Sequence, residues 1–205
     1  IHRLSMYYRA LSLLQKENYE TVSSKELAKR EKLTPAQVRK DLSFFGSFGT
    51  RGLGYPVAEL KAQIAGILGL DRTWRVALVG GGNIGSAPGS HKEFSKQGFQ
   101  IVKLFDNDQR KIGSNHKGII VSDIRNLETE LRDAKIEMVV LAVPATVAQY
   151  IVDDVIKGGI KAILNFAPLN LRVPEDIYLR NENMSMELEF LSFALVNNHP
   201  QKKMK

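Results

Sequence analysis

The stretch Arg75-Val-Ala-Leu-Val-Gly-Gly-Gly-Asn-Ile-Gly85 decides the fold that we expect for the second part of the chain. A short apolar run leads into Gly80, Gly82 and Gly85, which have the spacing G-x-G-x-x-G. The run is typical of a buried parallel strand. The glycines allow a tight turn, close approach of the backbone to a pyrophosphate, and packing of the next helix on the strand. The stretch therefore predicts a dinucleotide-binding turn; the alternative is a glycine-rich turn without a ligand.

Asp106 ends the next apolar run and is the candidate ribose ligand. It lies 21 residues after Gly85, close to the spacing at which a carboxylate binds the ribose hydroxyls of a dinucleotide. The residues that follow it are Asn107 and Asp108, so no Arg or Lys stands directly beside it to bind a 2′-phosphate. The sequence therefore favours NADH and NAD⁺ over NADPH and NADP⁺.

Predicted strands and helices alternate from residue 75 onward, which is typical of an α/β fold with a Rossmann-like, doubly wound parallel sheet. In such a sheet the ligand lies beyond the carboxyl ends of the strands. Several segments meet this condition and predict one crevice. The candidate cofactor-binding residues are Gly80, Gly81, Gly82, Asn83, Ile84, Gly85, Asp106, Lys111, Ala142, Val143, Pro144, Asn165, Phe166, Ala167 and Pro168.

The first third of the chain carries most of the positive charge. Residues 1–74 contain 12 Lys and Arg against 7 Asp and Glu, whereas residues 75–205 contain 17 against 15. A local excess of this kind indicates a surface that binds a polyanion.

Two short helices, predicted at residues 25–31 and 35–45, form a helix-turn-helix pattern in this basic part. Ser23 and Thr34 are the expected N-caps. Residues 48–55 are rich in glycine and predict a hairpin that would form a wing. The alternative is a small helical domain with a solvated basic face. The candidate DNA-binding residues are Ser24, Lys25, Gln37, Arg39, Lys40, Ser43, Arg51, Gly52 and Tyr55.

We expect three parts: a DNA-binding domain over residues 1–70, a nucleotide-binding domain over 75–185, and a C-terminal helix over 186–197. Residues 69–73 are the expected linker. The segment 186–196 is predicted to be an amphipathic helix. It carries more large apolar residues than a terminal helix with one solvated face needs, so it would pack on its own domain or on a second subunit.

Several classes of protein are disfavoured by what the sequence lacks. There is no cysteine, no apolar run near the length of a membrane span, and nothing that resembles a signal peptide, so we expect a cytoplasmic protein. A dehydrogenase needs a group that exchanges a proton during hydride transfer. None of the four histidines lies in a recognisable acid–base motif. The nucleotide is therefore expected to be a signal rather than a reagent.

The chain closely resembles the Rex family of bacterial redox-sensing transcriptional repressors over nearly its whole length. The segments that carry the resemblance are Val38-Arg-Lys-Asp-Leu-Ser-Phe-Phe-Gly46, Phe48-Gly-Thr-Arg-Gly-Leu-Gly-Tyr55, Gly82-Asn-Ile-Gly85, Ala142-Val-Pro144 and Gly159-Ile-Lys-Ala-Ile-Leu-Asn-Phe-Ala-Pro168.

The resemblance implies a winged-helix domain on palindromic operator DNA and a Rossmann domain that binds NADH or NAD⁺ as a sensed ligand. It implies a homodimer with domain-swapped C-terminal helices, in which Met184 of the partner subunit lines the nicotinamide pocket. It also implies a repressor that NADH releases from DNA, and not an enzyme. Two alternatives stay open: a small NAD-dependent oxidoreductase with an N-terminal helical extension, and a CoA-binding module.

The sequence departs from the family pattern after the glycine motif. Ser86 and His91 stand where the family often has Arg and Tyr, and Pro88 is expected to kink or delay the helix. Near the C-terminus, Asn183-Met184 replaces an Asp followed by an apolar or aromatic residue. These departures bear on nucleotide binding and leave the predicted DNA-reading helix intact.

Overall fold

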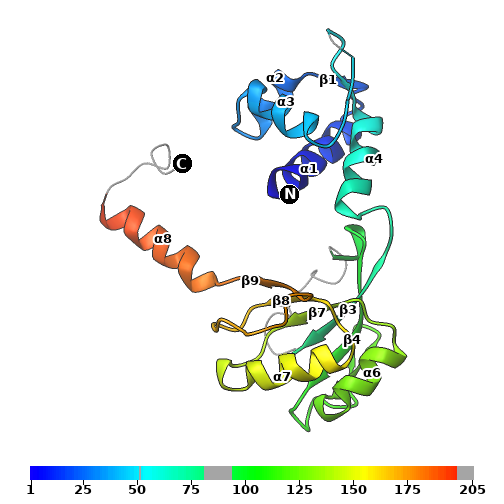
Figure 1. Cartoon of the computed structure of the whole chain (residues 1–205), viewed down its shortest axis with the longest axis vertical. Helices are drawn as coiled ribbons and strands as arrows, with labels where there is room; N and C mark the ends of the chain where they lie inside the picture. The colour runs from blue at the N-terminus through cyan, green and yellow to red at the C-terminus, as the bar shows by residue number, and fades with distance from the viewer. Residues whose placement is uncertain (51, 81–93, 198–205) are drawn as a thin grey trace. The chain divides into compact units, whose positions relative to one another are not determined.

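The computed structural model of the 205-residue chain describes residues 1–50, 52–80 and 94–197. The chain forms two compact units, Ile1–Thr73 and Trp74–Lys205. The first unit is mainly helical and the second is built on a β-sheet (Figure 1).

The described residues of the first unit form four helices and two short strands. The helices are α1 (His2–Lys16), α2 (Ser24–Arg30), α3 (Pro35–Ser43) and α4 (Val57–Leu68). The strands β1 (Thr21–Val22) and β2 (Tyr55–Pro56) pair antiparallel. The helix-turn-helix is present as the sequence predicted, and Thr50 and Gly54 form an antiparallel bridge within the predicted wing that follows it.

Local side chains set where α2 and α3 begin. Ser23 Oγ accepts a hydrogen bond from the Glu26 amide at 3.0 Å, and Thr34 Oγ1 accepts one from the Gln37 amide at 3.2 Å. Each cap satisfies a backbone donor that has no partner within the helix. Both predicted N-caps are confirmed.

The core of the first unit joins all four helices. Its fully buried side chains include Tyr7, Leu27, Val38, Leu42 and Ile64. The wing is fastened to this core through Gly54, which has φ +86° and whose added Cβ would lie 2.7 Å from the Val22 carbonyl oxygen. Only glycine accommodates both conditions.

A seven-stranded sheet forms the second unit. Its strand order is β5-β6-β4-β3-β7-β8-β9, and every neighbouring pair is parallel except β5 with β6. The strands are β3 (Trp74–Val79), β4 (Phe99–Asp106), β5 (Asn115–His116), β6 (Ile119–Asp123), β7 (Met138–Leu141), β8 (Ala162–Asn165) and β9 (Tyr178–Asn181). The chain runs outward from β3 on one side and then returns to β7 on the other, which is the topology of a Rossmann-like sheet.

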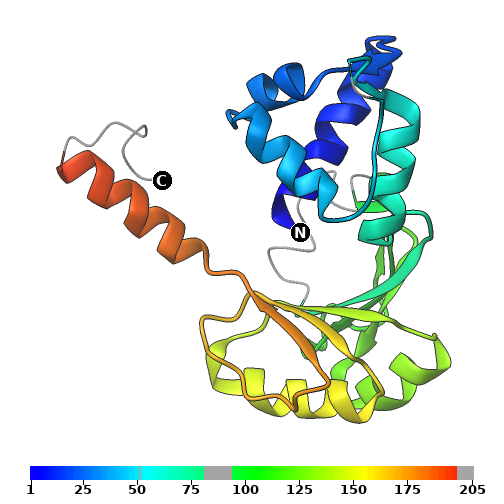
Figure 2. The same cartoon turned by 45° about the horizontal axis from the view of Figure 1, so that its top comes forward.

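Two helices, α6 (Leu127–Asp133) and α7 (Ala145–Lys157), cover the same face of the sheet (Figure 2). Val79, Phe105 and Leu141 are completely buried against them. The opposite face carries an apolar groove of about 360 Å³, which includes Val76, Met138 and Leu164.

The last described helix is α8 (Met184–Val196), and none of its residues is buried. The sequence predicted an amphipathic helix here, and this is wrong in one respect. Its large apolar side chains, including Phe190, Leu191 and Phe193, are exposed, and at about 100° per residue their positions spread around the helix rather than along one face. A helix that is apolar all round requires a covering partner.

Candidate nucleotide site and nucleic-acid interface

Gly80 stands at the carboxyl end of β3, where the chain turns out of the sheet. Its φ is +86°, and an added Cβ would lie 2.4 Å from the Ala142 carbonyl oxygen and 2.7 Å from a methyl of Val143. A side chain is therefore excluded at this position by both conformation and space. The close approach brings the ends of β3 and β7 together at the point where the strand order reverses, which is where ligands bind in such sheets.

Backbone hydrogen bonds align the neighbouring strand ends with this turn. The Gly80 amide donates to the Phe105 carbonyl oxygen at 2.9 Å. The Ala142 amide donates to the Val79 carbonyl oxygen, and the Phe166 amide to the Leu141 carbonyl oxygen, both at 2.8 Å. The predicted segments 142–144 and 165–168 therefore lie along the same edge of the sheet as Gly80. Val143 and Ala167 are buried, Ala142 and Phe166 are half-buried, and Pro144 and Pro168 are exposed.

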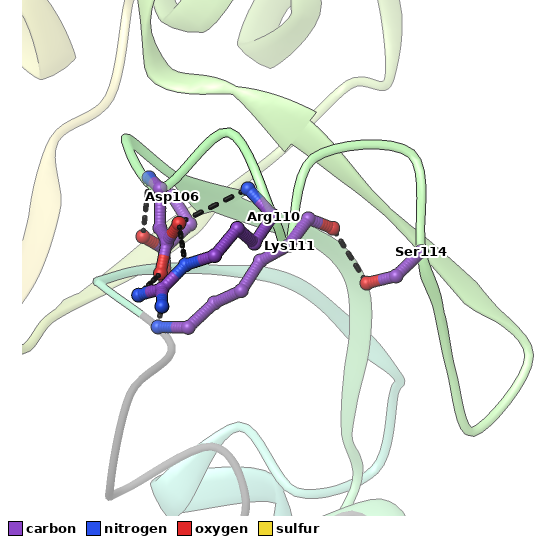
Figure 3. Close-up of polar contacts among 5 residues, drawn as sticks. Asp106, Arg110, Lys111 and Ser114 are labelled. Atoms are coloured by element: carbon purple, nitrogen blue, oxygen red, sulfur yellow. Dashed lines mark hydrogen bonds and ion pairs between the residues drawn. The ribbon is translucent and has the colours of Figure 1, made fainter.

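Asp106 is almost completely buried at the end of β4, with 6% of its surface exposed. Its Oδ1 accepts a hydrogen bond from the Asp108 amide at 3.0 Å, and its Oδ2 accepts one from Lys111 Nζ at 2.9 Å (Figure 3). A carboxylate has about four acceptor positions, so each oxygen keeps one for a ribose hydroxyl. The sequence predicted Lys111 as a cofactor residue, and the structure places it as the counter-ion of Asp106.

The loop after β4 is fixed by its own polar side chains. Arg110 pairs with Asp108 at 2.8 Å, and its hydrogen bonds lower the pKa of the Asp108 carboxyl to about 2. Ser114 Oγ donates to the Lys111 carbonyl oxygen at 2.5 Å. These contacts hold the backbone of Lys111 while its ammonium group reaches back to Asp106.

Asn165 does not have the role that the sequence predicted. It is completely buried, and its amide donates to the carbonyl oxygens of Ala167 and Leu169 and to Oδ1 of Asn181. Its Oδ1 accepts from the Ala167 amide at 2.9 Å. Every polar atom of the side chain is used inside the protein, so Asn165 shapes the loop 166–169 and does not itself face a ligand.

Some predicted residues lie outside the described part of the chain. They are Gly81, Gly82, Asn83, Ile84, Gly85, Ser86, Pro88 and His91 at the nucleotide site, and Arg51 in the wing.

Met184, which the resemblance implied as a contact from the partner subunit, is the first residue of α8. Its surface is 69% exposed. Asn183 caps the helix, because its side chain accepts a hydrogen bond from the Ser185 amide at 3.0 Å. Met184 is thus accessible to a second molecule.

The candidate DNA-binding surface joins α2, α3 and β2. Arg39 and Lys40 are exposed on α3, and Lys25 is exposed on α2. Arg39 Nη1 donates to Ser24 Oγ at 3.1 Å, which ties the start of α2 to the reading helix. Burial raises the pKa of Tyr55, and the nearby charge of Arg39 opposes that shift. Gly52 is exposed in the wing, with φ +88°.

Gln37 and Ser43 were both expected to face outward on α3, and this holds for Ser43 but only in part for Gln37. Gln37 is half-buried, and its Nε2 donates to Asp41 Oδ1 at 2.6 Å. Ser43 is exposed, but its hydroxyl proton is donated to the Lys40 carbonyl oxygen. Asp41 was not predicted as a functional residue, although its four-residue spacing from Gln37 places both on one face of the helix.

The described residues contain no group of three or more His, Asp or Glu side chains that could hold a metal ion. Among the same residues, no helix has both the length and the apolar character that a membrane span requires.

Comparison with known proteins identifies both parts of the chain. Residues 1–43 match the family model described as "Putative DNA-binding protein N-terminus", and residues 71–169 match the "CoA binding domain" model. The chain is 44% identical to the redox-sensing transcriptional repressor Rex of Desulforamulus reducens, covering 95% of this chain and 93% of the relative. It is 45% identical to Rex of Desulfitobacterium hafniense, covering 94% and 92%. The chain belongs to the Rex family.

Solved structures of a Rex-family repressor support the same assignment. The structure of RSP with β-NAD⁺ and operator DNA matches with a TM-score of 0.92 and 38% identity, over 96% of this chain and 91% of that one. RSP with β-NADH matches with a TM-score of 0.86 and 36% identity, over 100% and 96%. The curated relatives are named redox-sensing transcriptional repressors, and RSP is named a Rex-family repressor. The likeness thus favours the regulator over the small oxidoreductase considered from the sequence.

Proposed function

We propose that this Rex-family protein is a homodimeric repressor that binds palindromic operator DNA and leaves it when NADH binds. The observation that carries the proposal is the presence in one chain of a basic reading helix, with Arg39 and Lys40 exposed, and of two neighbouring parallel strands that end in the tight turn at Gly80 and in the buried carboxylate of Asp106. The RSP structures with operator DNA and NAD⁺, and with NADH, support it. A repressor of this kind acts where the chromosome is, which agrees with the expected cytoplasmic location.

The crevice suits a dinucleotide. Gly80 makes the tight turn that the first glycine of a dinucleotide-binding motif provides, since Ala142 and Val143 leave no space for a Cβ there. Asp106 keeps acceptor positions for the ribose hydroxyls, and Lys111 balances its charge. These residues bind and orient the nucleotide; the nicotinamide, when bound, supplies a group whose charge depends on its redox state.

The sheet edge that carries Val143, Phe166 and Ala167 suits the reduced nicotinamide. Reduced nicotinamide is neutral, whereas the oxidised ring is a cation. An apolar wall disfavours the cation, because burial of a charge is costly. We assign to these three residues, with Met184 from the partner subunit, the preference for NADH over NAD⁺.

The second subunit is expected to cover two apolar surfaces at once. Helix α8 carries large apolar side chains around its axis and has no buried residue, and the groove on the sheet face opposite α6 and α7 is lined mainly by apolar side chains. Exchange of α8 between subunits would place the helix of one protomer on the groove of the other. The domain-swapped homodimer therefore removes both surfaces from water.

A gel shift on a palindromic operator, at fixed salt, with NADH, NAD⁺ or no nucleotide, tests the proposal. The expected result is a complex of one dimer per operator that saturating NADH dissociates and NAD⁺ leaves intact. An operator complex that ignores both nucleotides would remove the sensing part of the proposal, and the absence of any sequence-specific complex would remove the repressor itself.

A further inference from the structure

The carboxylate of Asp41 collects four hydrogen bonds on the reading helix. Its Oδ1 accepts from Arg3 Nη2 at 2.8 Å and from Gln37 Nε2 at 2.6 Å. Its Oδ2 accepts from Arg3 Nε at 2.5 Å and from the Tyr7 hydroxyl at 2.8 Å. Arg3 and Tyr7 lie on α1, so this carboxylate joins α3 to the body of the domain.

All acceptor positions of Asp41 are in use, since two oxygens provide about four in total. The side chain is only 11% exposed. Asp41 is therefore unable to accept a hydrogen bond from a base, although it lies on the reading helix. Arg3 balances its negative charge, which would otherwise oppose the approach of phosphates.

The orientation of the Gln37 amide follows from this arrangement. A saturated carboxylate only accepts, so the nitrogen of Gln37 and not its oxygen must face Asp41. The hydrogen bonds of Arg3 lower the pKa of the Asp41 carboxyl to about 2, and it stays ionised at neutral pH. Within the described part of the chain, Oε1 of Gln37 receives no hydrogen bond.

We infer that Asp41 is a positioning residue that turns the carbonyl oxygen of Gln37 toward the DNA, so that Gln37 selects a base with an amino group over one with a keto group. This inference rests on the proposed DNA-binding function and adds a specificity rule to it. In the major groove, adenine and cytosine each present one amino donor, whereas guanine and thymine present keto oxygens. A glutamine amide that is free to rotate can present its nitrogen to a keto oxygen or its oxygen to an amino group. An amide whose nitrogen is bound to Asp41 presents only its oxygen.

The test measures base preference at each position of a duplex that the full-length protein selects from a randomised pool. The protein should prefer adenine or cytosine to guanine or thymine at one position of each half-site by about fivefold or more. Gln37→Ala should lose the preference at that position and keep the preferences at all other positions. At the same position, purine or 2-pyrimidinone, which lack the amino group, should bind like the disfavoured bases.

Asp41→Asn separates positioning from general stability. An asparagine at this site can donate to Gln37 Oε1 and release the amide to turn. The variant should lose the base preference at the position that Gln37 contacts and keep the preferences at the other positions. The double variant Asp41→Asn with Gln37→Ala should show the same base preference at that position as Gln37→Ala by itself. Tyr7→Phe removes a different donor from Asp41 and is the matched control, with an unchanged preference expected.

Three results would overturn the inference: an unchanged preference in Gln37→Ala, a uniform loss of affinity in Asp41→Asn with the base preferences retained, or a preference for keto groups. If Asp41→Asn does not fold, a second measurement still tests the inference. The parent protein and Gln37→Ala are compared in their binding to duplexes that contain purine or 2-pyrimidinone, and only the parent should lose affinity when the amino group is absent. A parent protein that selects no sequence at all would instead show that the proposed repressor function is wrong.

Discussion

Asn165 Nδ2 donates a hydrogen bond to Asn181 Oδ1 at 2.8 Å, and this bond joins the last residue of β8 to the last residue of β9, the strand that leads into α8. Asn165 is completely buried, whereas Asn181 is exposed. Asn183, two residues beyond Asn181, caps α8. The segment proposed to line the nicotinamide pocket is thus connected to the base of the proposed dimerisation helix by this side-chain hydrogen bond as well as by the backbone pairing of β8 with β9.

Asn165→Ala is expected to destabilise the second unit by about 2–4 kcal/mol. It would leave the buried amide and carbonyl groups of the loop without partners, and each such group costs about 1–3 kcal/mol. Asn181→Ala removes only the exposed partner and is expected to cost less than about 1 kcal/mol. Trp74, the one tryptophan in the sequence, begins β3, so its fluorescence during urea unfolding reports this unit. Equal effects of the two substitutions would contradict the role given to Asn165.

NADPH is expected to bind far more weakly than NADH, because its 2′-phosphate would meet the carboxylate of Asp106. Asp106→Ala should narrow the difference in affinity between NADH and NADPH. It should do so by weakening the binding of NADH, since the ribose hydroxyls lose their acceptor. Lys111→Met should widen it, because the cation that balances Asp106 is removed. Calorimetric titration of each variant with both nucleotides measures these changes, and equal affinities for NADH and NADPH in the parent protein would exclude the assignment of Asp106.

Arg39→Ala is expected to weaken operator binding. If Arg39 contacts a base edge, the loss is about 1–3 kcal/mol with relaxed sequence preference; if it contacts a phosphate, all sequences weaken alike and the salt dependence decreases. Lys161→Ala is the matched control, because it removes the same charge from the second unit, where Lys161 pairs with Asp176. A folded Arg39→Ala variant that binds operator like the parent would remove α3 from the interface.

The features that the sequence predicts well depend on neighbours along the chain. The caps at Ser23 and Thr34 are local hydrogen bonds, and the strands that lead to Gly80 and Val143 are continuous apolar runs between turn residues. Strand β9 was not predicted, since this short edge strand alternates exposed and half-buried residues and has no apolar run.

The features that the sequence predicts poorly depend on distant partners. Gln37 was expected to face outward, but its orientation is set by Asp41, which is in turn held by Arg3 and Tyr7 from another helix. Asn165 was expected to touch the ligand because it ends a strand, yet Asn181 and the following loop consume its hydrogen bonds. In the sequence, a polar residue at a strand end that contacts a ligand looks the same as one that holds a loop by internal hydrogen bonds.

Truncation after Met184 is expected to abolish the dimer or to cause aggregation. The deleted helix carries exposed apolar side chains, and its loss would leave the groove around Met138 and Leu164 open to water. Leu188→Glu should shift the parent dimer toward monomer, whereas Glu187→Ala on the same helix should not. Light scattering during size-exclusion chromatography distinguishes the species. A truncated chain that remains a monodisperse dimer of full stability would show that α8 is dispensable.

NADH and operator DNA are expected to weaken each other by the same factor. A ligand changes an equilibrium between two dimer arrangements only by its difference in affinity for them. We expect NADH to favour an arrangement in which the two α3 helices no longer fit major grooves one helical turn, or a multiple of it, apart. A typical coupling free energy is about 1–3 kcal/mol, and it must be reciprocal.

The measurement is a cycle of four affinities: operator with and without saturating NADH, and NADH with and without operator. All four need the same salt concentration, because salt alone changes DNA affinity by orders of magnitude. If operator affinity is independent of NADH, the chain is a DNA-binding protein without redox sensing, and Ser86, Pro88 and His91 are the first positions to restore toward the family pattern.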